Sequence, residues 1–211
     1  MCRILYARAD TEFSIAKMLA PFAELSRDSR EFQGHGWGCA WREGESWRQY
    51  HDIRPIWEDD LEQFGTSNLL LVHARSAFRD EGIVVENNMP FSDGESMFIF
   101  NGELRGVRIK SEGRIGAEKI YNYIRRFDKG DKLAATARAV DIIKKRSSYV
   151  RAMNIILSDG RQSCLSTSYS EDPDYFQLYQ KRKRDLHLVC SQPFADDQGW
   201  SRIDNHRTIE L

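Results

Sequence analysis

The chain has 211 residues, of which 41% are hydrophobic and 30% charged, and its formal net charge at pH 7 is -1. This length is enough for one sizeable core, and the balanced charge gives no electrostatic reason to expect nucleic acid or an anionic membrane as a partner. The four cysteines form no C-x-x-C pair, the first dozen residues are charged where a signal peptide would be apolar, and no apolar run approaches a membrane span. We therefore expect a cytoplasmic protein with a single domain over residues 1–211.

The first part of the chain predicts a strand, a helix and a hairpin. Residues 2–9, "CRILYARA", are apolar enough for a buried strand, and residues 11–26 then show apolar side chains at helical spacing, with Thr11 as the N-cap. Two aromatic arms, 37–42 and 47–51, flank the turn formers "EGES" as in a β-hairpin. The run "NLLLVHARS" predicts a further buried strand.

The rest of the chain predicts one more strand, two helices and a group of hairpins. Residues 96–104, "SMFIFNGEL", predict a strand that ends where the chain turns at Gly102, and the basic run Lys181 to Arg184 predicts a solvated turn. Helical periodicity predicts two helices, at 116–127 and 132–146. Hairpin signals then predict two strands within 149–168 and at least one more pair from 175–183 and 185–194. Many hairpins with helices in the middle suggest sheets packed face to face with helices outside.

Cys2 is the first candidate for chemistry. Removal of Met1 would give this residue the free α-amine of the chain, and an α-amine can take the proton of its own thiol, directly or through a water. Nucleophile and base would then belong to one residue.

Such a nucleophile needs donors for an oxyanion and a group that holds the substrate. Asn101 and Gly102 follow an apolar strand, so a side-chain amide and a backbone N–H could both point at one oxygen. Arg75, at the end of the buried strand, could bind a substrate carboxylate with two hydrogen bonds. His73 lies two residues earlier, on the same face of the strand, so it is a candidate for the wall of the site, although a core histidine is the simpler reading.

In this order, the pieces resemble the glutaminase domain of class II glutamine amidotransferases, which are N-terminal nucleophile hydrolases. The resemblance rests on "MCR", "HGWGCAW", "VHARSAF", "ENNMPF" and "FIFNGEL", and it runs along most of the chain. It implies an α+β fold, a four-layer αββα sandwich of two antiparallel sheets. It also implies Cys2 as nucleophile, Arg75 as the carboxylate-binding residue and Asn101 with Gly102 as the oxyanion pair.

The implied reaction is attack on a side-chain amide, release of ammonia from a thioester intermediate and hydrolysis to the acid. The resemblance implies no metal or organic cofactor. Many family members pass ammonia to an attached synthase domain, so an ammonia-supplying role here would imply a separate acceptor subunit.

One motif departs from the family pattern. Where the family has an aspartate that binds the ammonium of glutamine, this chain has Gly116, and Glu118 is the acid that remains in "GRIGAE". Three alternatives stay open. Glu118 or Glu112 holds the ammonium and glutamine is the substrate, the substrate is a γ-glutamyl or other amide, or the fold has lost its reaction and serves as a binding or scaffolding subunit.

Overall fold

The computed structural model describes every residue from Met1 to Leu211 except the side chain of Asp80. The chain divides into two compact units, each built from two separate segments. Unit 1 comprises residues 1–90 and 177–203, and unit 2 comprises residues 91–176 and 204–211. The prediction of a single domain over 1–211 stays a prediction.

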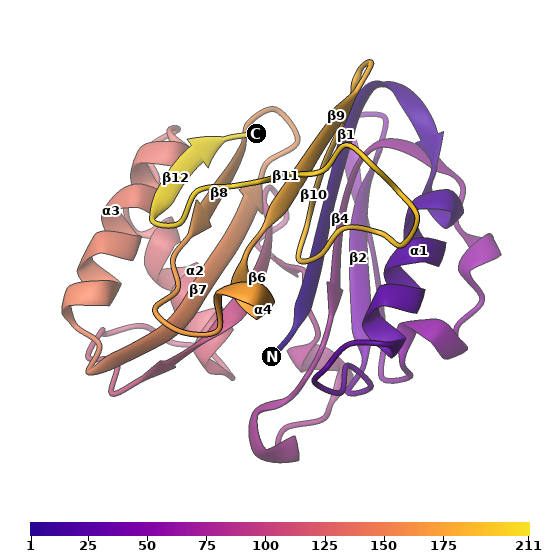
Figure 1. Cartoon of the computed structure of the whole chain (residues 1–211). Helices are drawn as coiled ribbons and strands as arrows, with labels where there is room; N and C mark the ends of the chain where they lie inside the picture. The colour runs from indigo at the N-terminus through magenta and orange to yellow at the C-terminus, as the bar shows by residue number, and fades with distance from the viewer. The chain divides into compact units, whose positions relative to one another are not determined.

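Unit 1 is a seven-stranded antiparallel sheet with one long helix, α1 (Ile15–Arg27), on one face (Figure 1). The strand order is β11-β9-β10-β1-β4-β2-β3. Their bounds are β1 Arg3–Ser14, β2 Trp37–Glu43, β3 Ser46–Asp52, β4 Thr66–Ala74, β9 Tyr179–Lys183, β10 Leu186–Cys190 and β11 Ser201–Arg202. Short 3-10 turns lie between β3 and β4, at Ile56–Glu58 and Leu61–Gln63, and after β4, at Phe78–Asp80 and Val85–Asn87.

The core of unit 1 forms between α1 and the sheet. Alternate residues of β1 and β4, such as Leu5, Ala7, Leu70 and Val72, pack with the apolar side of α1 in one buried cluster. The residues between them on the other face of the sheet, including Ile4 and Leu71, are fully buried as well. Burial of both faces explains why these strands read as continuous apolar runs rather than as alternating ones.

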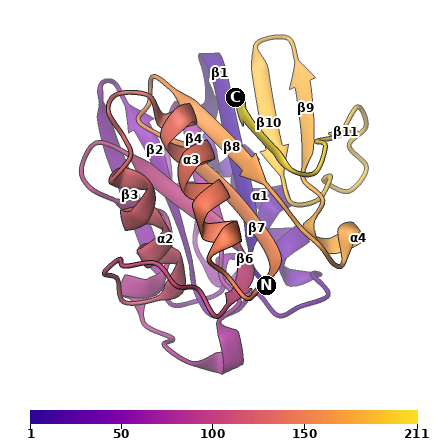
Figure 2. The same ribbon diagram turned by 90° about the vertical axis from the view of Figure 1, so that its left-hand side faces the viewer.

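Unit 2 is a five-stranded antiparallel sheet in the order β12-β8-β7-β6-β5, with helices α2 and α3 packed on one face (Figure 2). Its strands are β5 Phe91–Ser92, β6 Met97–Arg105, β7 Tyr149–Ser158, β8 Ser163–Thr167 and β12 Arg207–Glu210. The helices are α2 Gly116–Arg125, α3 Lys132–Lys145 and the short α4 Pro173–Phe176. Tyr121 of α2 stacks on Phe98 of β6 with ring centroids 5.0 Å apart, which fixes the helical face of this sheet.

The predicted α+β class with two antiparallel sheets is confirmed. Two predictions about local structure in unit 1 are wrong. The first helix begins at Ile15, because Ser14 Oγ caps it by accepting from Lys17 N–H, whereas Thr11 belongs to β1 and hydrogen-bonds Asp185. The basic run predicted as a turn mostly belongs to β9. None of the helices in the described part of the chain combines the length and the apolar character that a bilayer crossing requires.

His187 gives unit 1 a defined response to pH. It lies buried on β10 beside the Tyr6 ring, and burial, assisted by the nearby Arg182 charge, lowers the pKa of its imidazole from 6.5 to about 4. Because the unfolded chain binds the proton more tightly, stability from this group is fully present above pH 6.5 and is lost as the pH falls toward 4.

We expect the free energy of unfolding of the wild type to fall by about 3 kcal/mol more than that of His187→Gln between pH 7 and pH 4. Urea unfolding of both proteins across this range measures the difference. Parallel pH profiles for the two proteins would contradict the assignment.

Candidate functional site

Cys2 and Arg75 are brought together in unit 1 by the pairing of β1 with β4. These strands are antiparallel and Arg3 pairs with Ala74, so the same register carried one residue further places Cys2 opposite Arg75. The contacts of the Cys2 thiol with Ser76, the residue after Arg75, agree with this placement. Ser76 N–H donates to Cys2 Sγ at 3.5 Å, and Sγ lies 3.7 Å from the Ser76 carbonyl oxygen.

The Cys2 thiol is half-buried and its ionisation is under opposing influences. Burial raises the pKa of the thiol above its ordinary value. The terminal ammonium of Met1, the Ser76 N–H and the Arg75 guanidinium each act to lower this pKa. A proton acceptor beside the sulfur is therefore needed to generate a thiolate near neutral pH.

Residue 1 is held by the loop that follows α1. Its ammonium forms an ion pair with Glu31, and Gln33 Nε2 donates to the Met1 carbonyl oxygen at 2.7 Å. Gln33 also donates to the Glu31 carbonyl, which ties the loop to itself. The ammonium and the carbonyl of Met1, on either side of its Cα, are thus both bound by the loop after α1 in unit 1.

The segment that carries Arg75 and Ser76 is fixed by the chain just before β2. Arg75 N–H donates to Gly36 O at 2.9 Å, and His35 N–H donates to Arg75 O at 3.1 Å. Ala77 N–H donates to His35 Nδ1 at 2.8 Å. These three bonds position the backbone that contacts the Cys2 sulfur.

Arg75 is buried, and no described side chain balances its charge. Its side chain is 5% exposed, Nη1 is buried, and no side chain that the structure describes accepts from its guanidinium or forms an ion pair with it. Burial lowers the pKa of Arg75, although a guanidinium remains charged at any physiological pH. A buried cation of this kind costs several kcal/mol unless an anion joins it. The arrangement is suited to binding a carboxylate.

Replacing Arg75 with an apolar residue tests whether its charge destabilises the folded protein. We expect Arg75→Met to raise the free energy of unfolding by about 1–3 kcal/mol, because it removes an uncompensated buried charge. Lys17→Met, on the exposed face of α1, is the control and should change stability by less than about 0.5 kcal/mol. Chemical denaturation measures both. A marked loss of stability in Arg75→Met would show that the guanidinium has a structural partner.

His73 lies on β4 with its neighbours Val72 and Ala74 in the α1-facing cluster, so its side chain is on the opposite face of the sheet. It is fully buried. By strand alternation this is also the face of Ile4. Its predicted part in the wall of a site stays a prediction.

Asn101 and Gly102 lie inside a strand and not at a turn, which corrects the prediction for this segment. Strand β6 continues to Arg105, and Asn101 and Gly102 pair with Asn154 and Met153 of β7. Local preference of Asn-Gly for turns is overridden by the ladder. The glycine is needed for a different reason, since a Cβ at position 102 would lie 2.2 Å from the Ala152 carbonyl oxygen.

The backbone N–H of Gly102 points to the side of β6 away from β7. Met153 N–H donates to Ser168 O at 2.7 Å, so the backbone polar groups of Met153 face away from β6. Gly102 is therefore in a non-hydrogen-bonded pair with Met153, and its own N–H faces the opposite side. The partner strand on that side, β5, reaches only to Phe98 in the described ladder.

The side chain of Asn101 is fully buried, and neither its Nδ2 nor its Oδ1 has a hydrogen-bond partner among the described residues. Asn154, directly across the ladder, provides a contrast. Its Nδ2 donates to Phe176 O and its Oδ1 accepts from the Thr167 hydroxyl. The amide of Asn154 is therefore satisfied by the fold, whereas that of Asn101 is not satisfied by any described residue.

The two glycines 102 and 116 form a matched pair for a stability test. We expect Gly102→Ala to lower the free energy of unfolding by about 1–3 kcal/mol because of the clash with Ala152. Gly116→Ala, where nothing lies within 4 Å of the added Cβ, should be neutral or stabilising by up to about 1 kcal/mol. Equal effects of the two substitutions, measured by urea unfolding, would refute this account.

Glu118 is already engaged in unit 2. It lies in the first turn of α2, and Arg114 binds it through the backbone N–H and the guanidinium, with an ion pair of 2.6 Å. These bonds lower the pKa of the Glu118 carboxyl. The carboxylate predicted to hold a substrate ammonium is thus already paired with Arg114, which counts against that role. Gly116 is the first residue of α2, and a Cβ built on it has no atom within 4 Å.

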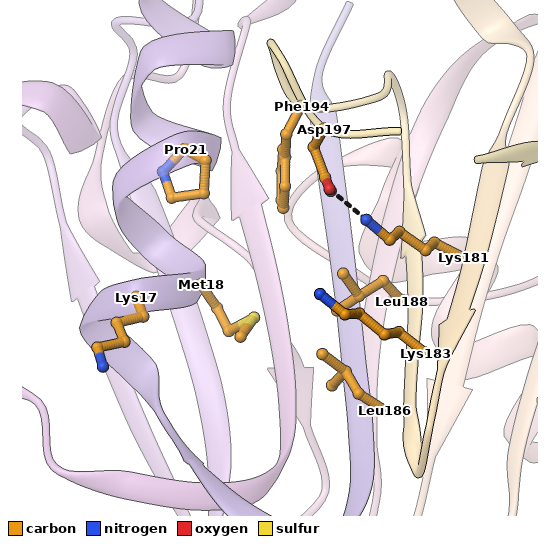
Figure 3. A pocket seen from close by; sticks show the side chains of 9 residues that line it. All are labelled: Lys17, Met18, Pro21, Lys181, Lys183, Leu186, Leu188, Phe194 and Asp197. Atoms are coloured by element: carbon orange, nitrogen blue, oxygen red, sulfur yellow. Dashed lines mark hydrogen bonds and ion pairs between the residues drawn. The ribbon is translucent and has the colours of Figure 1, made fainter. Parts of the chain in front are cut away.

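A cavity of about 230 Å³ lies elsewhere in unit 1 (Figure 3). It is lined by residues of α1, β9, β10 and the loop after β10, among them Met18, Lys183 and Phe194, with Lys181 ion-paired to Asp197 at its edge. It includes none of the predicted site residues, so it is not the candidate site.

Sequence reasoning missed several residues around Cys2. The Cys2 sulfur is contacted by Ser76, and Met1 is bound by Glu31 and Gln33. The backbone next to Ser76 is held by His35. These contacts join segments about 30 to 75 positions apart, so no local pattern reports them. The one available signal was the segment "HGWGCAW", which begins at His35 and is one of the pieces that carry the family resemblance.

Comparison with known sequences gives distant relatives and no family model that matches the chain. The γ-glutamyl-hercynylcysteine sulfoxide hydrolase of Mycolicibacterium smegmatis is 26% identical over 186 residues, which cover 83% of this chain and 77% of that protein. The protein of the same name from Mycobacterium tuberculosis is 25% identical over 188 residues, with 83% and 74% covered.

Comparison with solved structures shows the fold. A glutamine aminotransferase class-II domain protein from Silicibacter pomeroyi superposes with a TM-score of 0.68 at 17% identity, covering 99% of this chain and 94% of that one. A predicted glutamine amidotransferase from Pseudomonas aeruginosa gives 0.59 at 18% identity, covering 99% and 96%. The glutamine phosphoribosylpyrophosphate amidotransferase of B. subtilis gives 0.65 at 13% identity, and this chain spans 42% of its length. The resemblance to class II glutamine amidotransferases is confirmed at the level of fold.

Proposed function

We propose that this protein is an amide hydrolase that uses Cys2 as its nucleophile and cleaves a γ-glutamyl-type amide. The observation that carries the proposal is the half-buried Cys2 thiol held against Ser76, beside a buried Arg75 whose charge has no acidic partner in the described structure. The names of the relatives, which are hydrolases of a γ-glutamyl compound and amidotransferases that use glutamine, support the same class of reaction.

The proposed reaction starts from a chain without Met1. The α-amine of Cys2 takes the thiol proton, and the thiolate attacks the amide carbon to form a C–S bond and an oxyanion. The protonated amine then gives its proton to the leaving nitrogen as the C–N bond breaks. The amine then takes a proton from water as the water oxygen attacks the thioester carbon. The C–S bond breaks, the carboxylic acid leaves, and the amine returns the proton to the sulfur, which restores the free thiol.

Binding and charge stabilisation are assigned to four groups. Arg75 would bind the substrate α-carboxylate with its unpaired Nη1, and His73 would contribute to the wall beside it. Asn101 Nδ2 and Gly102 N–H, as the family resemblance assigns them, would donate to the oxyanion. Their support is that the Asn101 amide has no hydrogen-bond partner among the described residues, and that the register with β7 directs the Gly102 N–H to the other side of β6. Glu118 is left out of the ammonium-binding role because Arg114 already holds it.

Glutamine remains the second candidate substrate. The product would then be glutamate and ammonia, and a separate ammonia-accepting subunit would be the partner. A lapsed, purely structural role is less consistent with the molecule, since a buried unpaired guanidinium and a buried unpaired amide destabilise a fold that gains nothing from them.

Substitution of the nucleophile tests the proposal. We expect Cys2→Ala to reduce hydrolysis of γ-glutamyl-p-nitroanilide at least about 10⁴-fold, because the covalent step is lost. Cys164→Ala, which removes a buried thiol of unit 2, is the control and should keep the wild-type rate. Release of p-nitroaniline measures both.

Intact mass of the wild type from its native host should show loss of Met1. A chain that keeps Met1 and turns over the substrate, or a Cys2→Ala protein as active as the wild type, would overturn the mechanism.

A further inference from the structure

An exposed aromatic side chain lies in the loop that holds residue 1. Phe32 is between Glu31 and Gln33, which bind the ammonium and the carbonyl of Met1 as long as this residue is present. Glu31 is also close enough to Cys2 to influence the ionisation of its thiol. Phe32 is nevertheless 61% exposed, although phenylalanine is among the residues most often buried.

The Phe32 ring has a built position. It lies directly over Gly34, where a Cβ would come within 2.1 Å of the ring. Its edge-to-face partners are His35, with centroids 5.2 Å apart, and Trp57, at 6.2 Å. His35 in turn accepts from Ala77 N–H, next to the Ser76 backbone that contacts the Cys2 sulfur. We call Phe32, His35 and Trp57 the aromatic platform.

A second exposed apolar group follows Arg75 in the chain. Phe78 is 59% exposed, and Val84 and Val85 are also exposed. Gly82 returns close to the Arg75 guanidinium, with 3.9 Å between Nη2 and a Cβ built at Gly82. Two loops of unit 1, one linked through His35 to the segment that contacts Cys2 and one that passes the Arg75 guanidinium, therefore carry exposed apolar side chains.

We infer that the aromatic platform binds the amine portion of the substrate, and that this portion is bulky and apolar or aromatic rather than ammonia. Arg75 accounts for the acidic end of a γ-glutamyl amide, and the nucleophile lies opposite Arg75 in the strand register, so the amine portion needs a separate surface. An exposed ring fixed by its own glycine is suited to stack on such a group. This inference rests on the proposed function, since it assumes an amide cleaved at Cys2.

Three substrates with the same acyl part separate the alternatives: γ-glutamyl phenethylamide, γ-glutamyl ethylamide and glutamine. The first two release alkylamines of similar basicity, so their difference reports on binding of the ring rather than on leaving-group chemistry. We expect the wild type, with Met1 removed, to show kcat/KM at least about tenfold higher for the phenethylamide than for the ethylamide, and lower still for glutamine.

Phe32→Ala should bring the phenethylamide-to-ethylamide ratio of kcat/KM close to one, and Phe32→Trp should keep it. The ratio is measured on one protein sample, so partial misfolding does not change it. Trp47→Ala, which removes a half-buried aromatic residue on β3, is the matched control and should keep the wild-type ratio.

A wild-type ratio near one, or a ratio that Phe32→Ala leaves unchanged, overturns the aromatic platform while the Cys2 chemistry stands. Preference for glutamine over both secondary amides overturns it as well. Failure of the mature wild type to hydrolyse any of the three, or equal turnover in Cys2→Ala, overturns the proposed function and this inference together.

Discussion

The antiparallel register between β1 and β4 is the constraint on which the candidate site of unit 1 depends. It fixes Arg3 opposite Ala74, and so brings the second residue of the chain to the residue that follows β4. A slip of one residue would turn every side chain of β1 to the other face of the sheet, and the cluster around α1 could no longer form. Burial of the apolar side chains of both strands thus fixes their register, and the register fixes the position of the Cys2 thiol.

Local sequence patterns predicted much of the fold because most of its elements are specified locally. The hairpins β2–β3 and β7–β8 carry turn formers between apolar arms, and α2 and α3 show a clear helical period. The start of α1 was misplaced because Thr11 and Ser14 are both good N-caps. Thr11 instead bonds the distant Asp185, and the ladder with β4, which resumes at Phe13, keeps the chain in a strand as far as Ser14. The division into two units likewise depends on long-range pairing that no segment reports.

The candidate site was predictable only in part, and the reason is the same. Cys2, Arg75, Asn101 and Gly102 could be selected because ordered motifs resemble a known family. Their surroundings could not be selected, since Ser76, His35 and Glu31 act through contacts between distant segments. Asn-Gly was expected at a turn because that is its local preference, whereas tertiary pairing with β7 holds it inside β6.

Both units bury polar groups that lack a hydrogen-bond partner among the described residues. Arg75 Nη1 is such a group in unit 1, and the Asn101 amide is one in unit 2, where its counterpart Asn154 has partners for both polar atoms. A buried unsatisfied group costs about 1–3 kcal/mol, and more if it is charged, against a typical total stability of about 5–15 kcal/mol. An apolar residue of similar size would remove either cost. The neighbouring Asn154 shows that this sheet can satisfy a buried amide, so the unpaired state of Asn101 is a property of its position and not of the fold. The same burial that makes an unsatisfied group costly also strengthens any hydrogen bond it forms, so a ligand that offered an acceptor to either group would gain more from that bond here than at an exposed position.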